Sequence, residues 1–283
     1  SSNLAIPLSA EAPNMTMNTL PLLLEPTDLE LPKDQRHCRL VDLCSTEQYQ
    51  QGHIPGAVHL APTRIASPAP VPGLLPTRDV LQGLFAELGH HDQLHYIVYD
   101  DEGGGWAGRF IWLLDSIGHT HYSYINGGLK AWQQSGLALE QQANHASPSQ
   151  PDITLNSDHT VDIQNVKNNL QNPDRIIWDA RSAQEYRGEK VVAAKGGHIP
   201  GAINFEWTAG MDPERGLRLR EDLAQHLQTL GISADKEIVT HCQTHHRSGF
   251  TYLAAKLLGY PNVKAYAGSW AEWGNHPETP IEL

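Results

Sequence analysis

The sequence has few cysteines and no long apolar run. Only three of its 283 residues are cysteine, namely Cys38, Cys44 and Cys242. This small, odd number provides no disulfide framework, so we expect a reducing, cytoplasmic location. No apolar run approaches the roughly 18 residues that cross a bilayer, and the start of the chain lacks the basic segment of a secretory signal. A disulfide-rich secreted protein is therefore excluded, and we expect a soluble protein without a membrane partner.

Positive charge is also scarce. Twenty lysines and arginines stand against 32 acidic residues, which gives a formal net charge of −12. This balance excludes general nucleic-acid binding, which needs a basic face, but it still permits a local positive pocket. The length of 283 residues, 40% of them hydrophobic, predicts two domains that each bury their own core.

The chain contains two copies of one pattern. The segment GHIPGA occurs at 52–57 and again at 197–202. Further along, YIVYDDEGGGWAGRFIWLLDSIG (96–118) matches EIVTHCQTHHRSGFTYLAAKLLG (237–259) at an offset of 141 residues. Several rare residues coincide in register, so the similarity indicates a duplication.

The duplication predicts two domains of the same fold. We place the first copy at 21–139, a polar linker at 140–152 and the second copy at 153–283, and we expect residues 1–20 to be a poorly ordered extension. In each copy short apolar runs alternate with amphipathic helical patterns. Such alternation predicts an α/β fold with a largely parallel sheet and helices on both faces. In such sheets, ligands bind beyond the carboxyl ends of the strands.

Three short apolar runs in each copy are expected to be strands. They are residues 39–43, 96–99, 122–125, 175–179, 237–240 and 263–266. An amphipathic helix is expected before the second run of each copy, and its apolar face includes Val80 in the first copy and Leu230 in the second.

The two copies differ in the loop after the second apolar run. This loop opens at Asp101 in DDEGGGW and at Cys242 in HCQTHHRSG. A tight loop between a strand and a helix turns backbone N–H groups inward and forms an anion-binding nest. Arg247 adds positive charge, so the thiolate of Cys242 is favoured. We predict that Cys242 is a nucleophile, and an inert buried cysteine is the alternative.

The cysteine loop contains no glycine. Its nest must be made by Gln243, Thr244, His245 and His246, whose bulky side chains we expect to point outward. We expect these four residues and Arg247 to contact a small anionic substrate.

Two further segments carry a family resemblance. YQQGHIPGAVHL (49–60) and VKAYAGSWAEW (263–273) resemble the signatures of the two-domain rhodanese-type sulfurtransferases, which comprise thiosulfate and 3-mercaptopyruvate sulfurtransferases. The resemblance implies two tandem rhodanese-like domains and a covalent persulfide on Cys242, with no other cofactor and no metal. It also implies that Asp101 stands where an inactive first domain has lost its cysteine.

The same resemblance suggests a donor site. Arg181, in WDARSAQEY, resembles the arginine that binds the anionic end of the donor, and an ion pair with Asp179 or Glu185 is the alternative. Arg187 and Lys190, in an insertion of the second copy, are additional candidates for lining the pocket.

The loop sequence CQTHHR bears on the donor. It is neither the basic Arg-Lys-Gly type of thiosulfate enzymes nor the small Gly-Ser/Thr-Gly type of mercaptopyruvate enzymes. It resembles the Gln-Thr-His-His-Arg loop of some bacterial thiosulfate sulfurtransferases. The resemblance therefore favours thiosulfate as the donor, with cyanide, a thiol or a protein thiol as the acceptor, and we expect a monomer.

Three other functions stay open. A rhodanese-fold cysteine phosphatase has five residues between its Cys and Arg, whereas four separate Cys242 from Arg247, a spacing that suits sulfur better than phosphate. His241, Cys242, His245 and His246 are potential metal ligands, but ligands in such a loop do not converge tetrahedrally. A sulfur-relay protein would pass the persulfide to a protein acceptor.

Overall fold

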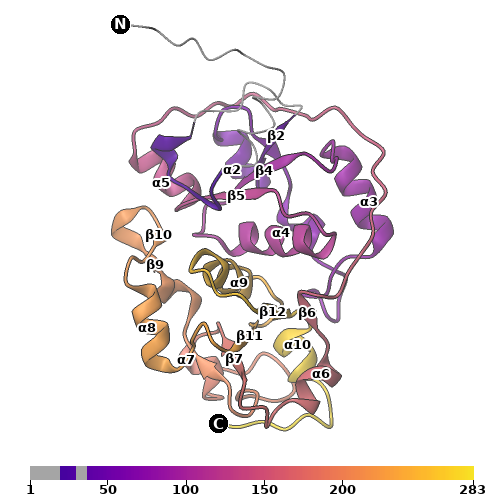
Figure 1. Ribbon diagram of the computed structural model, residues 1–283, viewed down its shortest axis with the longest axis vertical. Coiled ribbons are helices and arrows are strands. Elements are labelled where there is room, and N and C mark those ends of the chain that lie inside the picture. Colours follow the sequence, from indigo (N-terminus) through magenta and orange to yellow (C-terminus); the bar gives the residue numbers. More distant parts are fainter. Residues whose placement is uncertain (1–19, 30–36) are drawn as a thin grey trace, which may run out of the picture.

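The computed structural model describes residues 20–29 and 37–283, so the predicted extension 1–20 lies outside the described residues except for residue 20. Figure 1 shows two halves, with the first copy in indigo to magenta and the second in rose through orange to yellow. Their sheets have strand orders β1-β5-β4-β2-β3 and β6-β12-β11-β7-β8, and each pairing within them is parallel. Equivalent strands hold equivalent positions. The prediction of two α/β domains with largely parallel sheets is confirmed.

The six predicted strands are all present, within one residue at their ends. The first sheet contains β1 (Leu23–Leu24), β2 (Cys38–Asp42), β3 (Val58–His59), β4 (His95–Tyr99) and β5 (Tyr122–Ile125). The second contains β6 (Thr160–Val161), β7 (Arg175–Asp179), β8 (Ile203–Asn204), β11 (Glu237–His241) and β12 (Val263–Tyr266), and a hairpin is formed by β9 (Met211–Asp212) and β10 (Arg218–Leu219). The sequence missed the edge strands because two residues are too few to show a periodic pattern.

Helices cover both sheets. They are α2 (Thr46–Gln51), α3 (Arg78–Glu87), α4 (Gly105–Ser116), α5 (Gly128–Gln134), α6 (Ile163–Asn168), α7 (Ala183–Tyr186), α8 (Leu223–Leu230), α9 (Arg247–Leu257) and α10 (Ser269–Trp273). Two residues expected on apolar faces are exposed instead, Val80 at 51% and Leu230 at 41%. Val80 flanks the buried stripe of α3 and Leu230 is the last residue of α8. Within the described residues, no helix is long and apolar enough to cross a membrane.

The GHIPGA turns have the same structure in both domains. His53 stacks on Tyr49 with ring centroids 3.8 Å apart, and His198 stacks on Tyr186 at 3.6 Å. Each histidine Nδ1 lies 2.7 Å from the carbonyl oxygen of its tyrosine. These histidines therefore fix a turn between a helix and the next strand.

The chain after the last helix of each domain returns to this turn. Glu140 forms an antiparallel bridge with His53, and Glu282 forms the equivalent bridge with His198. The Glu140 carboxylate accepts from the Gly56 N–H at 2.7 Å and from Asn144 Nδ2 at 2.8 Å. Residue 140, where the predicted linker begins, is thus bound to the first domain, and the linker boundaries stay a prediction.

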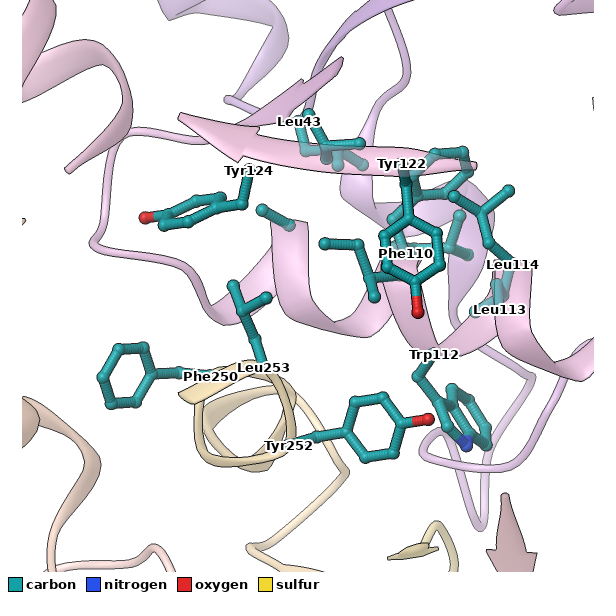
Figure 2. Packing of buried hydrophobic residues seen from close by; sticks show 14 of the residues in the cluster. Leu43, Phe110, Trp112, Leu113, Leu114, Tyr122, Tyr124, Phe250, Tyr252 and Leu253 are labelled. Atoms are coloured by element: carbon teal, nitrogen blue, oxygen red, sulfur yellow. The ribbon is translucent and has the colours of Figure 1, made fainter. Parts of the chain in front are cut away.

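Helices α4 and α9 pack against each other where the two domains meet. A Cβ atom on Gly108 would lie 1.9 Å from the carbonyl oxygen of Gly249, so the two helix backbones touch at equivalent residues. Figure 2 shows Trp112 of α4 beside Tyr252 of α9 in the shared apolar core. The Tyr252 hydroxyl donates to Asp115 across the contact at 2.5 Å. This approach brings the loops before α4 and α9 together.

Candidate active site

Cys242 lies where the sequence places it, between the end of β11 and the start of α9. The residue is 1% exposed. Its Sγ accepts from the backbone N–H of His246 at 3.3 Å and from the hydroxyl of Ser248 at 3.4 Å. Donors of this kind at a helix N-terminus stabilise a negatively charged sulfur.

The C-terminal signature, residues 263–273, supports the cysteine loop by hydrogen bonds. The backbone N–H of Cys242 donates to Ser269 Oγ at 3.3 Å. The Trp270 and Ala271 N–H groups, at the start of α10, donate to the carbonyl oxygens of Cys242 and Gln243, each at 2.9 Å. The sequence VKAYAGSWAEW therefore positions the loop by main-chain and hydroxyl hydrogen bonds.

Arg181 is buried in an ion pair. Its Nη2 lies 2.7 Å from Asp179 Oδ2 and donates to the carbonyl oxygen of Gly197 at 2.8 Å. Its guanidinium carbon lies 4.4 Å from the centre of the Trp270 ring, and the residue is 1% exposed. This geometry is the ion-pair alternative of the sequence analysis, and the donor-binding role of Arg181 stays a prediction.

Arg247 is paired as well. Its two terminal nitrogens donate to the two carboxylate oxygens of Glu185 at 2.7 and 3.0 Å. Burial opposes the charge of Arg247, but the hydrogen bond with Glu185 and the thiolate of Cys242 hold its pKa above the usual value. Burial likewise opposes the Glu185 charge, and the bond from Arg247 nevertheless lowers its pKa to about 2. Both groups are charged at neutral pH, so this pair ties α9 to α7.

His245 points inward, and the expectation of an outward side chain is wrong for it. Its φ of 52° turns the side chain toward the domain contact, where it is 0% exposed and lies edge-on to Trp112 at 4.5 Å. Burial and then the charge of Arg109 hold its pKa well below the usual value, so it is neutral at pH 7. Its Nδ1 lies 2.6 Å from Ser248 Oγ. When Ser248 donates to the sulfur of Cys242, His245 Nδ1–H is the donor to Ser248.

His246 is held by the first domain. Its ring stacks on Trp106 with centroids 3.9 Å apart and planes 13° apart. Its Nε2 contacts the carboxylate of Glu102, and Trp207 lies at 5.7 Å. Glu102 and Trp106 belong to the first-domain loop DDEGGGW. This loop therefore holds the ring of His246, whose backbone N–H donates to the sulfur of Cys242.

The remaining predicted substrate residues are two residues of the loop and two residues of the insertion. Gln243 and Thr244 are partly exposed within the loop. Arg187 lies in the exposed insertion after α7 and pairs with Glu189 at 3.0 Å, and Lys190 is exposed nearby. Roles for these four residues in binding a donor stay predictions.

In the first domain, the equivalent nest is filled by a side chain. The Asp100 carboxylate accepts from the backbone N–H groups of Glu102 and Gly104 at 3.0 Å and of Ala107 at 2.9 Å. Burial, followed by the charge of Glu102, raises the pKa of Asp100 to about 7. Asp101 aligns with the cysteine, as the sequence indicates, but the anion in the nest belongs to the preceding residue.

The loop histidines diverge from Cys242. His241 Nδ1 bonds to the Cys242 carbonyl oxygen, while His245 and His246 turn to Ser248 and Glu102. In the part of the chain that the structure describes, no three His, Cys, Asp or Glu residues are grouped to hold a metal ion.

Sequence reasoning missed several residues of this network. They are Glu102, Trp106, Arg109, Ser248 and Ser269. Ser248 follows Arg247 directly, and Arg109 interrupts an apolar helix where the second copy has Phe250, so both left a visible signal. The contacts of Glu102 and Trp106 with His246 gave no signal in the sequence, because they depend on how the two domains pack together.

Known proteins resemble this chain over nearly its whole length. It is 57% identical to the thiosulfate sulfurtransferase of Azotobacter vinelandii over 267 residues, covering 94% of this chain and 98% of the relative. It is 32% identical to the 3-mercaptopyruvate sulfurtransferase of Escherichia coli K12, covering 83% of this chain and 85% of the relative. Among solved structures, the anaerobic ergothioneine biosynthesis enzyme from Chlorobium limicola shares the fold, with a TM-score of 0.80 at 24% identity over 93% of this chain and 70% of that one.

The family model for the rhodanese-like domain matches the chain twice, at residues 25–135 and 162–276. Each match contains four strands of one sheet, and the remaining strand, β1 or β6, ends directly before the match begins. The chain therefore belongs to the rhodanese family, as a tandem of two rhodanese-like domains.

Proposed function

We propose that this protein is a thiosulfate sulfurtransferase that works through a persulfide on Cys242, with no cofactor and no metal. The observation that carries the proposal is the Cys242 sulfur at the start of α9, which receives hydrogen bonds from the His246 N–H and the Ser248 hydroxyl. The similarity to a relative named thiosulfate sulfurtransferase, at 57% identity, supports thiosulfate over 3-mercaptopyruvate as the donor.

The reaction is a double displacement. The Cys242 thiolate attacks the outer sulfur of thiosulfate, a new S–S bond forms, and sulfite leaves with the electrons of the broken S–S bond. Cys242 then carries a terminal sulfur with one negative charge. A thiophilic acceptor, such as cyanide or a thiolate, takes that sulfur and regenerates the thiolate. Covalent catalysis of this kind splits one difficult transfer into two easier ones.

The loop serves both steps because the sulfur is anionic in each. The His246 N–H and the Ser248 hydroxyl are fixed before the reaction, so they need no reorganisation when charge develops. The backbone N–H of His246 could supply ~2.7–4 kcal/mol if it acts like an oxyanion-hole donor, and the 3.4 Å bond from the Ser248 hydroxyl supplies less. In the first domain, the Asp100 carboxylate accepts from the N–H groups of Glu102, Gly104 and Ala107, so a side chain of the protein already occupies the nest of that loop.

The loop geometry favours sulfur over phosphate. A phosphatase loop needs a free arginine that wraps a tetrahedral anion. Here the Arg247 guanidinium is bound at two points by Glu185, and only four residues separate it from Cys242. Hydrolysis of an aryl phosphate faster than sulfur transfer would overturn this assignment.

Intact mass spectrometry tests the proposal. Treatment with thiosulfate should add one sulfur atom to the protein, and cyanide should then remove it. Cys242→Ala should gain no sulfur, whereas Cys44→Ala, which removes a buried thiol of the first domain, should still gain it. No gain in the unaltered protein, or a gain in Cys242→Ala, contradicts the mechanism.

The same assay addresses donor and acceptor. Loading with 3-mercaptopyruvate should be slower than loading with thiosulfate. Faster release of sulfur to a protein thiol than to cyanide would favour a relay role. We also propose a cytoplasmic location, because three cysteines provide no disulfide framework. We propose a monomer, and light scattering of the purified protein checks the oligomeric state.

A further inference from the structure

Arg109 of helix α4 is a buried cation beside the cysteine loop. It is 1% exposed, although it belongs to the first domain. Its guanidinium donates to carbonyl oxygens of Ile65 at 2.9 and 2.7 Å, Gly73 at 2.7 Å and Leu74 at 3.0 Å. A further bond, of 3.2 Å, crosses to the carbonyl oxygen of His245 in the cysteine loop. The first domain thus holds the loop through a main-chain atom.

These carbonyl groups satisfy the hydrogen bonds of Arg109 but do not cancel its charge, and the Trp112 ring, 5.1 Å from the guanidinium carbon, offsets only part of it. Among residues 20–29 and 37–283, no carboxylate forms an ion pair with it. Burying an uncompensated charge costs several kcal/mol, so buried cations are normally paired. Burial lowers the pKa of Arg109 to about 10, and the Cys242 thiolate acts in the opposite direction. Arg109 bonds directly to the cysteine loop, at a residue three positions after Cys242, so the sulfur of this loop is the anion that we assign to its charge.

The other charged groups around the loop already have partners. They form the pairs Asp179 with Arg181, Glu185 with Arg247, and Glu102 with His246. Burial lowers the pKa values of both His241 and His245, which favours their neutral forms. Among the described residues around the loop, Arg109 is therefore a buried cation whose charge has no carboxylate partner.

We infer that Arg109 is a positioning residue of the sulfur-transfer site, in which its buried charge balances the sulfur of Cys242 and its bond to the His245 carbonyl fixes the loop. The part of this inference that concerns the persulfide rests on the proposed function. The thiolate and the persulfide each carry one negative charge on sulfur. Arg109 is therefore compensated in both halves of the cycle, and a neutral adduct on Cys242 leaves it unbalanced.

The test uses the pH profile of Cys242 alkylation by iodoacetamide. In Arg109→Gln, the midpoint of the profile should move upward by about one pH unit, a tenfold loss of thiolate near neutral pH. Arg109→Lys keeps the charge but loses the planar fork, so its midpoint should move upward by less. Arg39→Gln, at a buried arginine on β2 that donates to the Leu88 carbonyl, is the matched control and should keep the original midpoint.

An unchanged midpoint in folded Arg109→Gln overturns the inference. If that variant does not fold, two alkylated forms of the unaltered protein provide a second test of the inference. Iodoacetate leaves a carboxylate on Cys242 and iodoacetamide leaves a neutral group of similar size. The carboxylate adduct should melt at the higher temperature, and equal melting temperatures overturn the inference. Alkylation needs no thiosulfate, so this result is independent of whether thiosulfate loads the protein.

Discussion

The loops 100–106 and 241–247 have the same scaffold and hold different anions. Each follows a central strand and ends in a helix that points N–H groups back toward it. In the first loop the Asp100 carboxylate takes three of these groups, and in the second the sulfur of Cys242 takes one together with the Ser248 hydroxyl. The nest is therefore a property of the fold. Whether the loop can transfer sulfur depends on whether a carboxylate or a thiolate occupies it.

The comparison also shows that the first domain is part of the site. Glu102 and Trp106 hold the His246 ring, while Arg109 holds the His245 carbonyl. The first loop has no thiol, and residues in and directly after it contact the second loop. The following predictions test how far the two copies differ.

Moving the thiol between the copies should have the largest effect. Cys242→Ala should lose at least ~10³-fold of sulfur transfer, because the nucleophile is gone. Adding Asp101→Cys should not restore activity, because the carboxylates of Asp100 and Glu102 oppose a second anion there. Cyanolysis of protein-bound sulfur measures both variants. If sulfur were bound at residue 101, a cysteine at the position aligned with Cys242 would be sufficient for sulfur loading, whatever the surrounding loop.

Crowding the domain contact should reduce stability next. A Cβ on Gly249 would lie 2.3 Å from the carbonyl oxygen of Gly105, and neither backbone can move without the other. We expect Gly249→Ala to lower the free energy of unfolding by about 2–3 kcal/mol in urea denaturation. Gly83→Ala in α3 has open space around its Cβ and should be neutral or stabilising by up to ~1 kcal/mol. Equal effects of the two substitutions would rule out the close approach.

Removing the hydroxyl donor should slow sulfur loading moderately. Ser248→Ala loses a hydrogen bond to the sulfur worth about 1–1.5 kcal/mol, which corresponds to about a tenfold slower reaction with thiosulfate. The aligned residue of the first domain is Ala107, and Ala107→Ser provides a reciprocal control that should not change the rate. Stopped-flow loading at a fixed pH measures both variants. Similar rates for the two would remove Ser248 from the mechanism.

The smallest effect should come from the carboxylates at the two GHIPGA turns. Burial opposes the Glu140 charge, but bonds from Asn144 and from the Gly56 N–H keep its pKa below the usual value. A lowered folded-state pKa stabilises the protein above the ordinary carboxyl pKa, and this contribution is lost as the pH falls through the folded value. Glu140→Gln should therefore cost about 0.5–1 kcal/mol at pH 7, allowing for solvent screening, and less at acid pH.

The equivalent carboxylate of the second domain is the control for that prediction. Glu282 is 55% exposed and accepts from the Gly201 N–H at a longer 3.4 Å. Glu282→Gln should cost less than Glu140→Gln in urea denaturation at pH 7. A difference that persists unchanged at acid pH would assign it to packing rather than charge.

The sequence predicted the fold well because repeated local patterns specify it. Two copies of each strand and of GHIPGA, in register, located the sheets and placed Cys242 at a strand end. It failed for His245, because a φ of 52° reverses the direction expected for a side chain in the loop. It also missed the bond between Arg109 and His245, which are 136 residues apart and meet only when the domains dock. The apolar pattern and motifs of one copy predict the fold of that copy, but they do not predict which residues contact the other copy.

The meeting of Gly108 with Gly249 has the form of a two-fold dimer interface, in which equivalent residues face each other. In a dimer of identical subunits, any substitution appears on both sides of such a contact. Within one chain each side changes alone, so Arg109 faces the cysteine loop while its aligned partner Phe250 faces Gly104 of the other loop. Because both halves belong to one chain, a substitution in one half need not be matched in the other, and a residue of the first domain can hold the loop of the second.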